Sequence, residues 1–254
     1  MKSEKRKVII HFSLFTFHFS LFMNSAIIVA AGSGTRFGTK TPKQFLEILG
    51  KPLVIHTLER FESCPAIDEI IIVLSLEETA GFRQTAEKYN LKKLAKIVAG
   101  GDTRAASVLN GLNAIDSQKC EIVAVHDGAR PLVSIREISA TVEKARETGA
   151  ACLVASIPDT IKEVADGKIV GTIDRSNLRR ALTPQCFRLE ILKRAFAENE
   201  ISEIVTDECF LVEKLGYEIA TVEGGAQNIK ITNREDFVFA ENLLKQLEDS
   251  EFRI

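Results

Sequence analysis

From residue 26 onward, runs of consecutive apolar residues alternate with segments in which apolar residues recur every three or four positions. The first kind includes AIIVAA (26–31), DEIIIVLS (68–75), AKIVAG (95–100) and EIVAVHDG (121–128). Strands that are apolar on both faces, separated by amphipathic helices, are typical of a parallel sheet covered on both sides. The pattern therefore predicts an α/β fold with a Rossmann-like, mostly parallel sheet between two layers of helices.

The amphipathic segments predict where these helices lie. Apolar residues recur at helical spacing in 52–64, 77–90, 103–115, 136–149, 188–199 and 206–216. A further strand is expected at 217–224, and a last helix from Asn233, whose side chain can cap it. No repeat or low-complexity linker divides residues 23–254, so we expect a single domain there.

The alternation of strands and helices breaks after the apolar run ACLVASIP (151–158). Residues 159–178 contain two runs of period two joined by Asp166-Gly167, which is a strong signal for a β-hairpin turn. The hairpin interrupts the domain at about 158–179 rather than ending it. We expect a protruding β-hairpin arm that packs against a partner subunit; an ordinary edge hairpin fits the pattern equally well.

Composition and charge exclude several classes of protein. Lys and Arg number 33 against 35 Asp and Glu, a net charge of −2, so no overall positive field draws the chain to nucleic acid or to an anionic membrane. The cysteines are odd in number and form no CxxC pair, which argues against a zinc site or a disulfide framework and favours the reducing cytoplasm. They are Cys64, Cys120, Cys152, Cys186 and Cys209.

The loop after the first predicted strand has the character of a phosphate-binding loop. Gly32 and Gly34 let the backbone turn tightly and present N–H groups to an anion. The dinucleotide fingerprint fails, because Phe37 stands where the third glycine belongs, and no Gly-Lys-Ser/Thr of a P-loop follows. Arg36 and Lys43 supply positive charge suited to a triphosphate. The alternative is a solvated basic loop that only connects a strand to a helix.

Two more loops are expected at the same edge, because ligands of such sheets gather at the carboxyl ends of the strands. After AKIVAG come Gly101, Asp102 and Ser107, which suit a base or ribose pocket. For Asp102 taken alone, an ordinary helix N-cap is the favoured interpretation. Asp127 ends the run EIVAVHD and is a natural ligand for Mg²⁺, or else a carboxylate that caps a turn. His126 beside it is expected to form hydrogen bonds without transferring a proton.

The first 22 residues carry a different pattern. A basic start, MKSEKRK, precedes the apolar stretch VIIHFSLFTFHFSLF, as in a secretory signal, and the stretch is too short for a comfortable membrane span. The segment is either a removable export signal or an upstream extension of a protein that starts at Met23. We favour the extension, since export would place a nucleotide site outside the cytosol. In both cases residues 1–22 are excluded from the fold.

Taken together, seven segments resemble the 2-C-methyl-D-erythritol 4-phosphate cytidylyltransferases of the non-mevalonate isoprenoid pathway. The segments are AAGSGTRFGTKTPKQF, GGDTRAASVLNGL, VHDGARP, DTIKEV, DRSNLRRALTPQ, VTDE and NIKIT, in this order. The first loop alone is also typical of sugar nucleotidyltransferases, whereas the set is specific. The resemblance implies that CMP is transferred from CTP to a sugar-alcohol phosphate, with pyrophosphate as the leaving group and Mg²⁺ as the cofactor near Asp127.

The resemblance also implies a role for individual residues. Arg36 and Lys43 would stabilise the charge of the transition state. Residues of the CTP site would be Ala30, Ala31, Gly32, Gly34, Gly101, Asp102 and Ser107. Arg175 and Lys230 would position the acceptor, together with Asp127, Arg130, Thr160, Thr183 and Thr206. Because Thr160 and Arg175 lie on the hairpin arm, which crosses to a second subunit in this family, a homodimer is expected.

Two other functions compete with this one. A ribitol 5-phosphate cytidylyltransferase would share the same loops and differ in the acceptor; the intact DTIKEV and NIKIT segments favour the erythritol substrate. A non-catalytic nucleotide-binding regulator belongs to a different class. The presence of Arg36, Lys43 and Asp127 together argues against it, since a binding protein has no transition state to stabilise.

Overall fold

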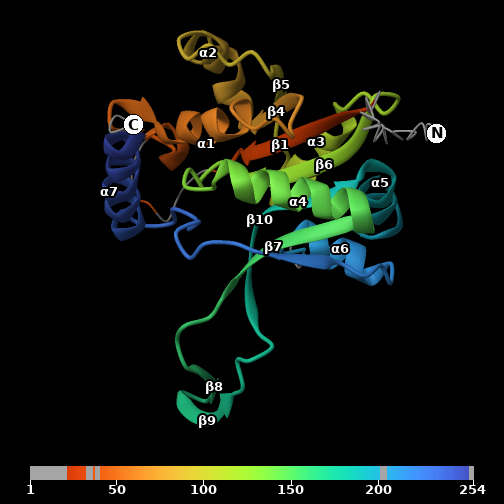
Figure 1. Cartoon of the computed structure of the whole chain (residues 1–254), viewed down its shortest axis with the longest axis vertical. Helices are drawn as coiled ribbons and strands as arrows, with labels where there is room; N and C mark the ends of the chain where they lie inside the picture. Colours follow the sequence, from red (N-terminus) through yellow and green to blue (C-terminus); the bar gives the residue numbers. More distant parts are fainter. Residues whose placement is uncertain (1–21, 33–36, 38–40, 201–204, 252–254) are drawn as a thin grey trace, which may run out of the picture.

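The computed structural model describes residues 22–32, 37, 41–200 and 205–251. Within this part of the chain, seven strands form one central sheet, with helices on both of its faces (Figure 1). In spatial order the strands are β11 (Ala220–Glu223), β7 (Ala150–Ser156), β10 (Arg179–Arg188), β6 (Cys120–Asp127), β1 (Met23–Ala30), β4 (Glu69–Leu74) and β5 (Leu94–Ala99). All the strands predicted from continuous apolar runs are present, which confirms the α/β fold.

The strand β10 was not predicted, and it runs antiparallel to both of its neighbours, β6 and β7. The other neighbouring strands pair in parallel. The register of β10 against β7 shifts between Ala181 and Gln185, around a cis peptide bond that precedes Pro184. Proline has no N–H to donate to the hydrogen bonds between strands, so its presence in a sequence argues against a central strand. The sheet is therefore mostly, not wholly, parallel, as expected.

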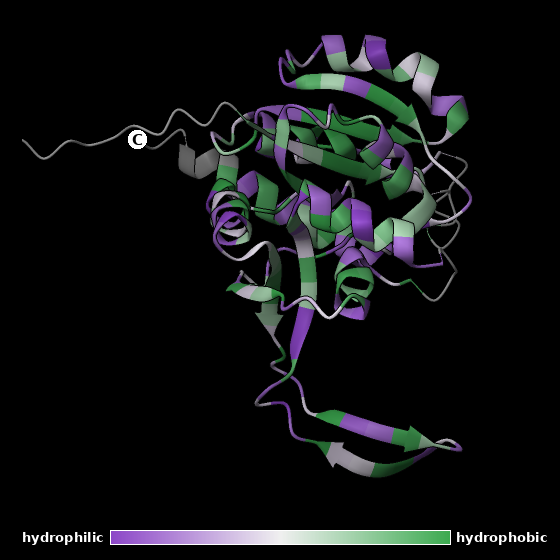
Figure 2. Cartoon of the chain, turned by 90° about the vertical axis from the view of Figure 1, so that its right-hand side faces the viewer, coloured by the Kyte–Doolittle hydropathy of each residue, from purple (hydrophilic) through white to green (hydrophobic). Residues whose placement is uncertain are grey.

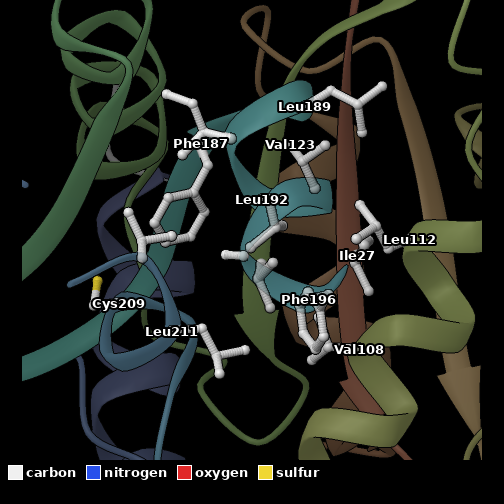
Figure 3. Packing of buried hydrophobic residues seen from close by; sticks show 14 of the residues in the cluster. Ile27, Val108, Leu112, Val123, Phe187, Leu189, Leu192, Phe196, Cys209 and Leu211 are labelled. Atoms are coloured by element: carbon white, nitrogen blue, oxygen red, sulfur yellow. The ribbon is translucent and has the colours of Figure 1, made fainter. Parts of the chain in front are cut away.

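Two hydrophobic clusters lie on opposite faces of the sheet, and consecutive strand residues enter opposite clusters, as a period of two requires. On β1, Ile27 packs against α3 (Arg104–Asn113), while Ile28 faces the other layer. Figure 3 shows residues of the first cluster, among them Ile27, Phe187 and Phe196. This cluster also takes in α5 (Leu189–Glu198) and α6 (Glu208–Lys214), and the second takes in α1 (Leu53–Glu62), α2 (Leu76–Glu87) and α4 (Ile135–Thr148).

The last helix, α7 (Arg234–Glu251), covers a third apolar cluster beside α1 (Figure 1). Phe37 and Ile231 belong to this cluster, together with Ile48 of the short strand β2 (Glu47–Ile48). The helix begins as predicted, because the Asp236 N–H donates to Asn233 Oδ1 at 2.8 Å. The short elements η2 (Lys43–Phe45) and β3 (Lys51–Pro52) lie between the first loop and α1.

The predicted hairpin is present and stands well away from the body of the molecule (Figure 1). It consists of β8 (Ile161–Ala165) and β9 (Lys168–Ile173), and its turn residues Asp166 and Gly167 have φ values of 51° and 74°. These positive angles are those of the turn that an Asp-Gly pair favours. Hydrophobic and polar residues are interspersed along the arm (Figure 2), and Val164 and Ile169 are 60% and 66% exposed.

Predictions for the start of the chain fall largely outside the described residues, since the description begins at Phe22. The strand β1 begins at Met23, and the domain boundary at 22/23 stays a prediction. None of the described helices is both long and apolar enough to cross a membrane.

Candidate active site

A cavity of about 520 Å³ opens at the carboxyl ends of β1, β5 and β6, at the edge where the sequence places the site. It collects residues from the loop after each of these strands, from η2 and from the segment that precedes α7. The lining comprises Val29, Ala30, Ala31, Gly32, Lys43, Gln44, Gly101, Asp102, Thr103, Arg104, Ser107, Asp127, Ala129, Lys230 and Thr232. Nine residues from the sequence-based proposal are among them.

The buried side chain of Gln44 shapes the first loop. Its Nε2 donates to the carbonyl oxygens of Ala30 at 2.7 Å and Gly32 at 2.9 Å. These bonds tie η2 to the end of β1, so the backbone of residues 30–32 is held at the mouth of the cavity. Gln44 belongs to the motif AAGSGTRFGTKTPKQF, which by itself indicates no role for this side chain. The predicted Gly34 and Arg36 lie outside the described residues.

The second loop is closed on itself by Ser107. The Gly101 N–H donates to Ser107 Oγ at 3.1 Å, and this hydroxyl donates to the Thr103 carbonyl at 3.0 Å. A side chain at Gly100 would collide with the Cβ of Ala31, so the two loops approach each other closely only because a glycine stands there. The proposed helix cap at Asp102 is wrong: Thr103 is the N-cap, and its hydroxyl accepts from the Ala106 N–H at 3.0 Å.

A single carboxylate, Asp127, gathers three cations at the far side of the cavity. Its Oδ1 lies 3.1 Å from Arg104 Nε, and its Oδ2 lies 3.1 Å from both Arg130 Nε and Lys230 Nζ. Burial by itself would raise the pKa of Asp127, but the charges of Arg104, Lys230 and Arg130 hold this pKa far below its ordinary value. The carboxylate is therefore ionised at any physiological pH. We call these four residues the Asp127 cluster.

Neutral hydrogen bonds fix the backbone beneath this cluster. The Asp127 N–H donates to Thr183 Oγ1 at 3.2 Å, and this hydroxyl lies 3.0 Å from Nδ1 of His126. On the other side of the imidazole, Nε2 lies 3.2 Å from the carbonyl of Arg130. All three contacts are satisfied when Nε2 carries the single ring proton. Burial lowers the pKa of His126 to about 3, so the imidazole is neutral at physiological pH.

The segment that carries Lys230 lies along the loop after β6. Arg130 Nη1 donates to the Asn228 carbonyl at 2.9 Å, and the Ile231 N–H donates to the Ala129 carbonyl, also at 2.9 Å. Lys43 reaches the same segment, since its Nζ donates to the Ile231 carbonyl at 2.7 Å. Lys43 and Lys230, far apart in the sequence, therefore line one cavity.

Five predicted acceptor residues do not line this cavity. Arg130 and Thr183 contact Asp127 beside it, whereas the other three lie elsewhere on the chain. Thr160 and Arg175 are exposed on the arm, where Arg175 donates to the carbonyl of Pro158. Thr206 is exposed just before α6. The arm points away from the body, so its two residues do not complete the cavity of their own chain (Figure 1). Their roles stay predictions.

Besides Gln44, Arg104 and Glu208 also had no role predicted from the sequence. Arg104 donates from Nη1 and Nη2 to the two carboxylate oxygens of Glu208, at 2.7 and 3.1 Å. Both stand inside quoted motifs, GGDTRAAS and VTDE, and this was the available signal. A charged pair so far apart in sequence cannot be matched without the topology.

The described residues do not build a metal centre of their own. No group of three or more His, Cys, Asp or Glu side chains converges within this part of the chain. Asp127 offers one carboxylate, and both of its oxygens already contact cations. A Mg²⁺ ion that rests mainly on substrate phosphates and water needs little more from a protein. The prediction of Asp127 as a direct metal ligand stays a prediction, and these ion pairs weaken it.

Comparison with known proteins specifies the kind of nucleotide site. The sequence profile of the 2-C-methyl-D-erythritol 4-phosphate cytidylyltransferases matches residues 24–246. The chain belongs to this family. It is 44% identical over 230 residues to the 2-C-methyl-D-erythritol 4-phosphate cytidylyltransferase of Alkaliphilus metalliredigens, which covers 89% of this chain and 95% of that protein. The counterpart from Bacillus licheniformis is 43% identical over 225 residues, covering 88% and 96%.

A solved structure of the same family has a similar fold. The 4-diphosphocytidyl-2C-methyl-D-erythritol synthase of Anaerococcus prevotii superimposes with a TM-score of 0.76 at 30% identity, covering 88% of this chain and 96% of that one. Membership of the cytidylyltransferase family confirms the resemblance drawn from the seven segments. It also agrees with the cavity, where backbone groups of two glycine-containing loops face a wall of positive side chains. Such a wall suits two phosphate-bearing substrates that repel each other.

Proposed function

We infer that the chain transfers CMP from CTP to 2-C-methyl-D-erythritol 4-phosphate, giving 4-diphosphocytidyl-2-C-methyl-D-erythritol and pyrophosphate, in the non-mevalonate route to isoprenoid precursors. The observation that carries this inference is the convergence of two nucleotide loops, Lys43 and three members of the Asp127 cluster on one cavity. The fourth member, Arg130, pairs with Asp127 beside it. A regulator that only binds nucleotide would have no use for a second cationic group opposite the nucleotide loops.

In the proposed reaction, a phosphate oxygen of the acceptor attacks the α-phosphorus of CTP, and the bond from this phosphorus to the pyrophosphate oxygen breaks. The acceptor is a phosphate monoester whose oxygens are already charged, so no general base is required. The barrier lies in bringing two anions together and in the charge that builds up at phosphorus. Lys43 and Lys230 supply fixed positive charge there, and Arg36 is proposed to do the same.

We propose Mg²⁺ as the cofactor, carried mainly by the phosphate oxygens of CTP and by water, since the protein side offers at most Asp127. When bound, the ion neutralises part of the triphosphate charge. The chain's own residues then divide the remaining work. Gln44 and Ser107 hold the nucleotide loops in shape, and Asp127 spaces Arg130 and Lys230 for the acceptor phosphate.

We also propose a homodimer in which the arm of each subunit reaches the cavity of its partner. Thr160 and Arg175 are exposed at the base of the arm, and apolar side chains such as Val164 and Val170 are exposed on its strands. Covering these side chains would remove apolar area from water, which favours association. A cytoplasmic location is proposed because all five cysteines are buried free thiols.

Pyrophosphate release from CTP and Mg²⁺ tests the function. We expect release with 2-C-methyl-D-erythritol 4-phosphate, and much slower release with ribitol 5-phosphate at equal concentration. A clear preference for ribitol 5-phosphate would overturn the acceptor, and no release with either compound would favour the nucleotide-binding regulator.

A further inference from the structure

Arg104 connects the predicted nucleotide loop to the Asp127 cluster. Its backbone is the first residue of α3, directly after the loop that holds Gly101 and Asp102. Its side chain crosses to the Asp127 cluster, where Nε lies 3.1 Å from Asp127 Oδ1. Any change in the orientation of this guanidinium therefore alters the geometry between the nucleotide loop and the acceptor side.

The orientation of Arg104 is set by Glu208, whose side chain is 0% exposed. The carboxylate receives Nη1 and Nη2 in a bidentate pair, which fixes the plane of the guanidinium as well as its position. Burial would lower the pKa of Arg104, but Glu208 and Asp127 offset this and raise it above its usual value. The guanidinium is thus permanently charged and held from two sides.

Glu208 is itself anchored by the sheet. Gln185 of β10 accepts the N–H groups of Glu208 and Cys209 on its Oε1, at 3.1 and 3.0 Å, and donates from Nε2 to Asp207 at 2.9 Å. The start of α6 is therefore tied to the centre of the sheet. A carboxylate held this rigidly can act as a fixed support for Arg104.

We propose that Glu208 is a positioning residue for cytidylyl transfer: it holds Arg104 in the orientation that keeps Asp127, and with it Arg130 and Lys230, in place for the acceptor. The inference rests on the proposed function. Without Glu208, Arg104 keeps one of its three ion contacts and is free to turn toward the phosphates of CTP. Because Glu208 does not line the cavity, its effect on the substrates passes through Arg104.

The test is a double-mutant cycle with Glu208→Gln and Arg104→Gln, read as kcat and as KM for each substrate. Glutamine has the shape of glutamate but lacks its charge, and it replaces one carboxylate oxygen with an NH₂ group that cannot accept a hydrogen bond from the guanidinium. Glu208→Gln should lower kcat/KM for the acceptor by about 10- to 100-fold, with the KM for CTP changed by less than about threefold. Adding Glu208→Gln to Arg104→Gln should then cost little more, because residues that act in series are not additive.

Glu213→Gln, an exposed position on the same helix, is the matched control and should behave like the wild type. Arg104→Lys covers the case in which Glu208→Gln does not fold, since an ammonium cannot form the planar bidentate pair that the guanidinium makes with Glu208. It should lower kcat/KM for the acceptor by a similar factor. The positioning role would be overturned if the losses of the two single variants multiplied in the double variant, or if kcat/KM for the acceptor were unchanged in both single variants. A wild type that releases no pyrophosphate would instead refute the proposed function, and this inference with it.

Discussion

Asp127 shows how one buried carboxylate can organise a site for anions. Each of three cationic groups has a nitrogen 3.1 Å from an oxygen of Asp127, and without this negative charge the three would repel one another. The carboxylate removes this repulsion and sets their spacing, while leaving the group with an excess of positive charge. Its value for the reaction therefore lies in the position of its neighbours rather than in proton transfer, since its lowered pKa keeps it ionised.

Asp127→Asn should lower kcat/KM for the acceptor by about 100-fold or more. Removing the negative charge of the carboxylate leaves the positive charges of the cluster unpaired. Steady-state assays with varied acceptor measure this effect. Asp116→Asn changes an exposed aspartate that pairs with the surface residue Lys119 and accepts from the Gln118 N–H, and it should leave the rate unchanged. A wild-type rate in Asp127→Asn would contradict the assigned role.

His126 makes the stability of the fold depend on pH. In the unfolded chain a histidine takes up a proton near pH 6.5, whereas in the folded protein burial lowers the pKa of His126 to about 3. Between these values the unfolded state binds the extra proton. The free energy of unfolding should therefore fall as the pH falls below 6.5, with a limiting slope of about 1.4 kcal/mol per pH unit.

Urea unfolding at pH 7.5 and 5.5 measures this slope. His126→Gln has no group that titrates in the interval and should lose less stability between the two values than the wild type, even if it starts from a lower one. Equal losses in the two proteins would show that His126 does not remain neutral in the folded state.

Among the elements, those with a strong local pattern were predicted and those defined by their neighbours were not. The hairpin was found because Asp166-Gly167 carries its own turn signal, and α7 because Asn233 carries its own cap. β10 was missed, since Pro184 breaks its pattern and its antiparallel position depends on where the chain returns from the arm. The same holds for the site: motif residues were found, whereas the Arg104–Glu208 pair needed the topology.

The arm offers a prediction of its own. Arg175→Ala should lower kcat/KM for the acceptor by about 10- to 100-fold and leave the KM for CTP nearly unchanged, since the charge is proposed to meet the acceptor phosphate. Lys168→Ala, which removes a similar exposed charge from β9 of the same arm, is the control and should have no effect. An unchanged kcat/KM for the acceptor in Arg175→Ala would show that Arg175 does not contribute to the acceptor site.

Considered as a whole, the molecule has a cavity on its body and two proposed acceptor residues on an arm that points away from it (Figures 1 and 2). None of the four hydrophobic clusters of the described residues includes a residue of β8 or β9. The arm therefore gains little from its own body, which supports the proposed dependence on a second subunit. This dependence can be tested without knowing the interface.

Mixing two defective variants tests whether each arm serves the partner's cavity. Arg175→Ala has an intact cavity and a defective arm, whereas Asp127→Asn has an intact arm and a defective cavity. When both are co-expressed equally, half of the dimers are mixed, and each mixed dimer regains one complete site of its two, so about a quarter of the wild-type activity should return. Combining Arg175→Ala with Thr160→Ala should restore nothing, because both defects lie on the arm. If the arm instead folded back on its own cavity, every chain in the first mixture would carry one defect, and activity would stay at the level of the separate variants.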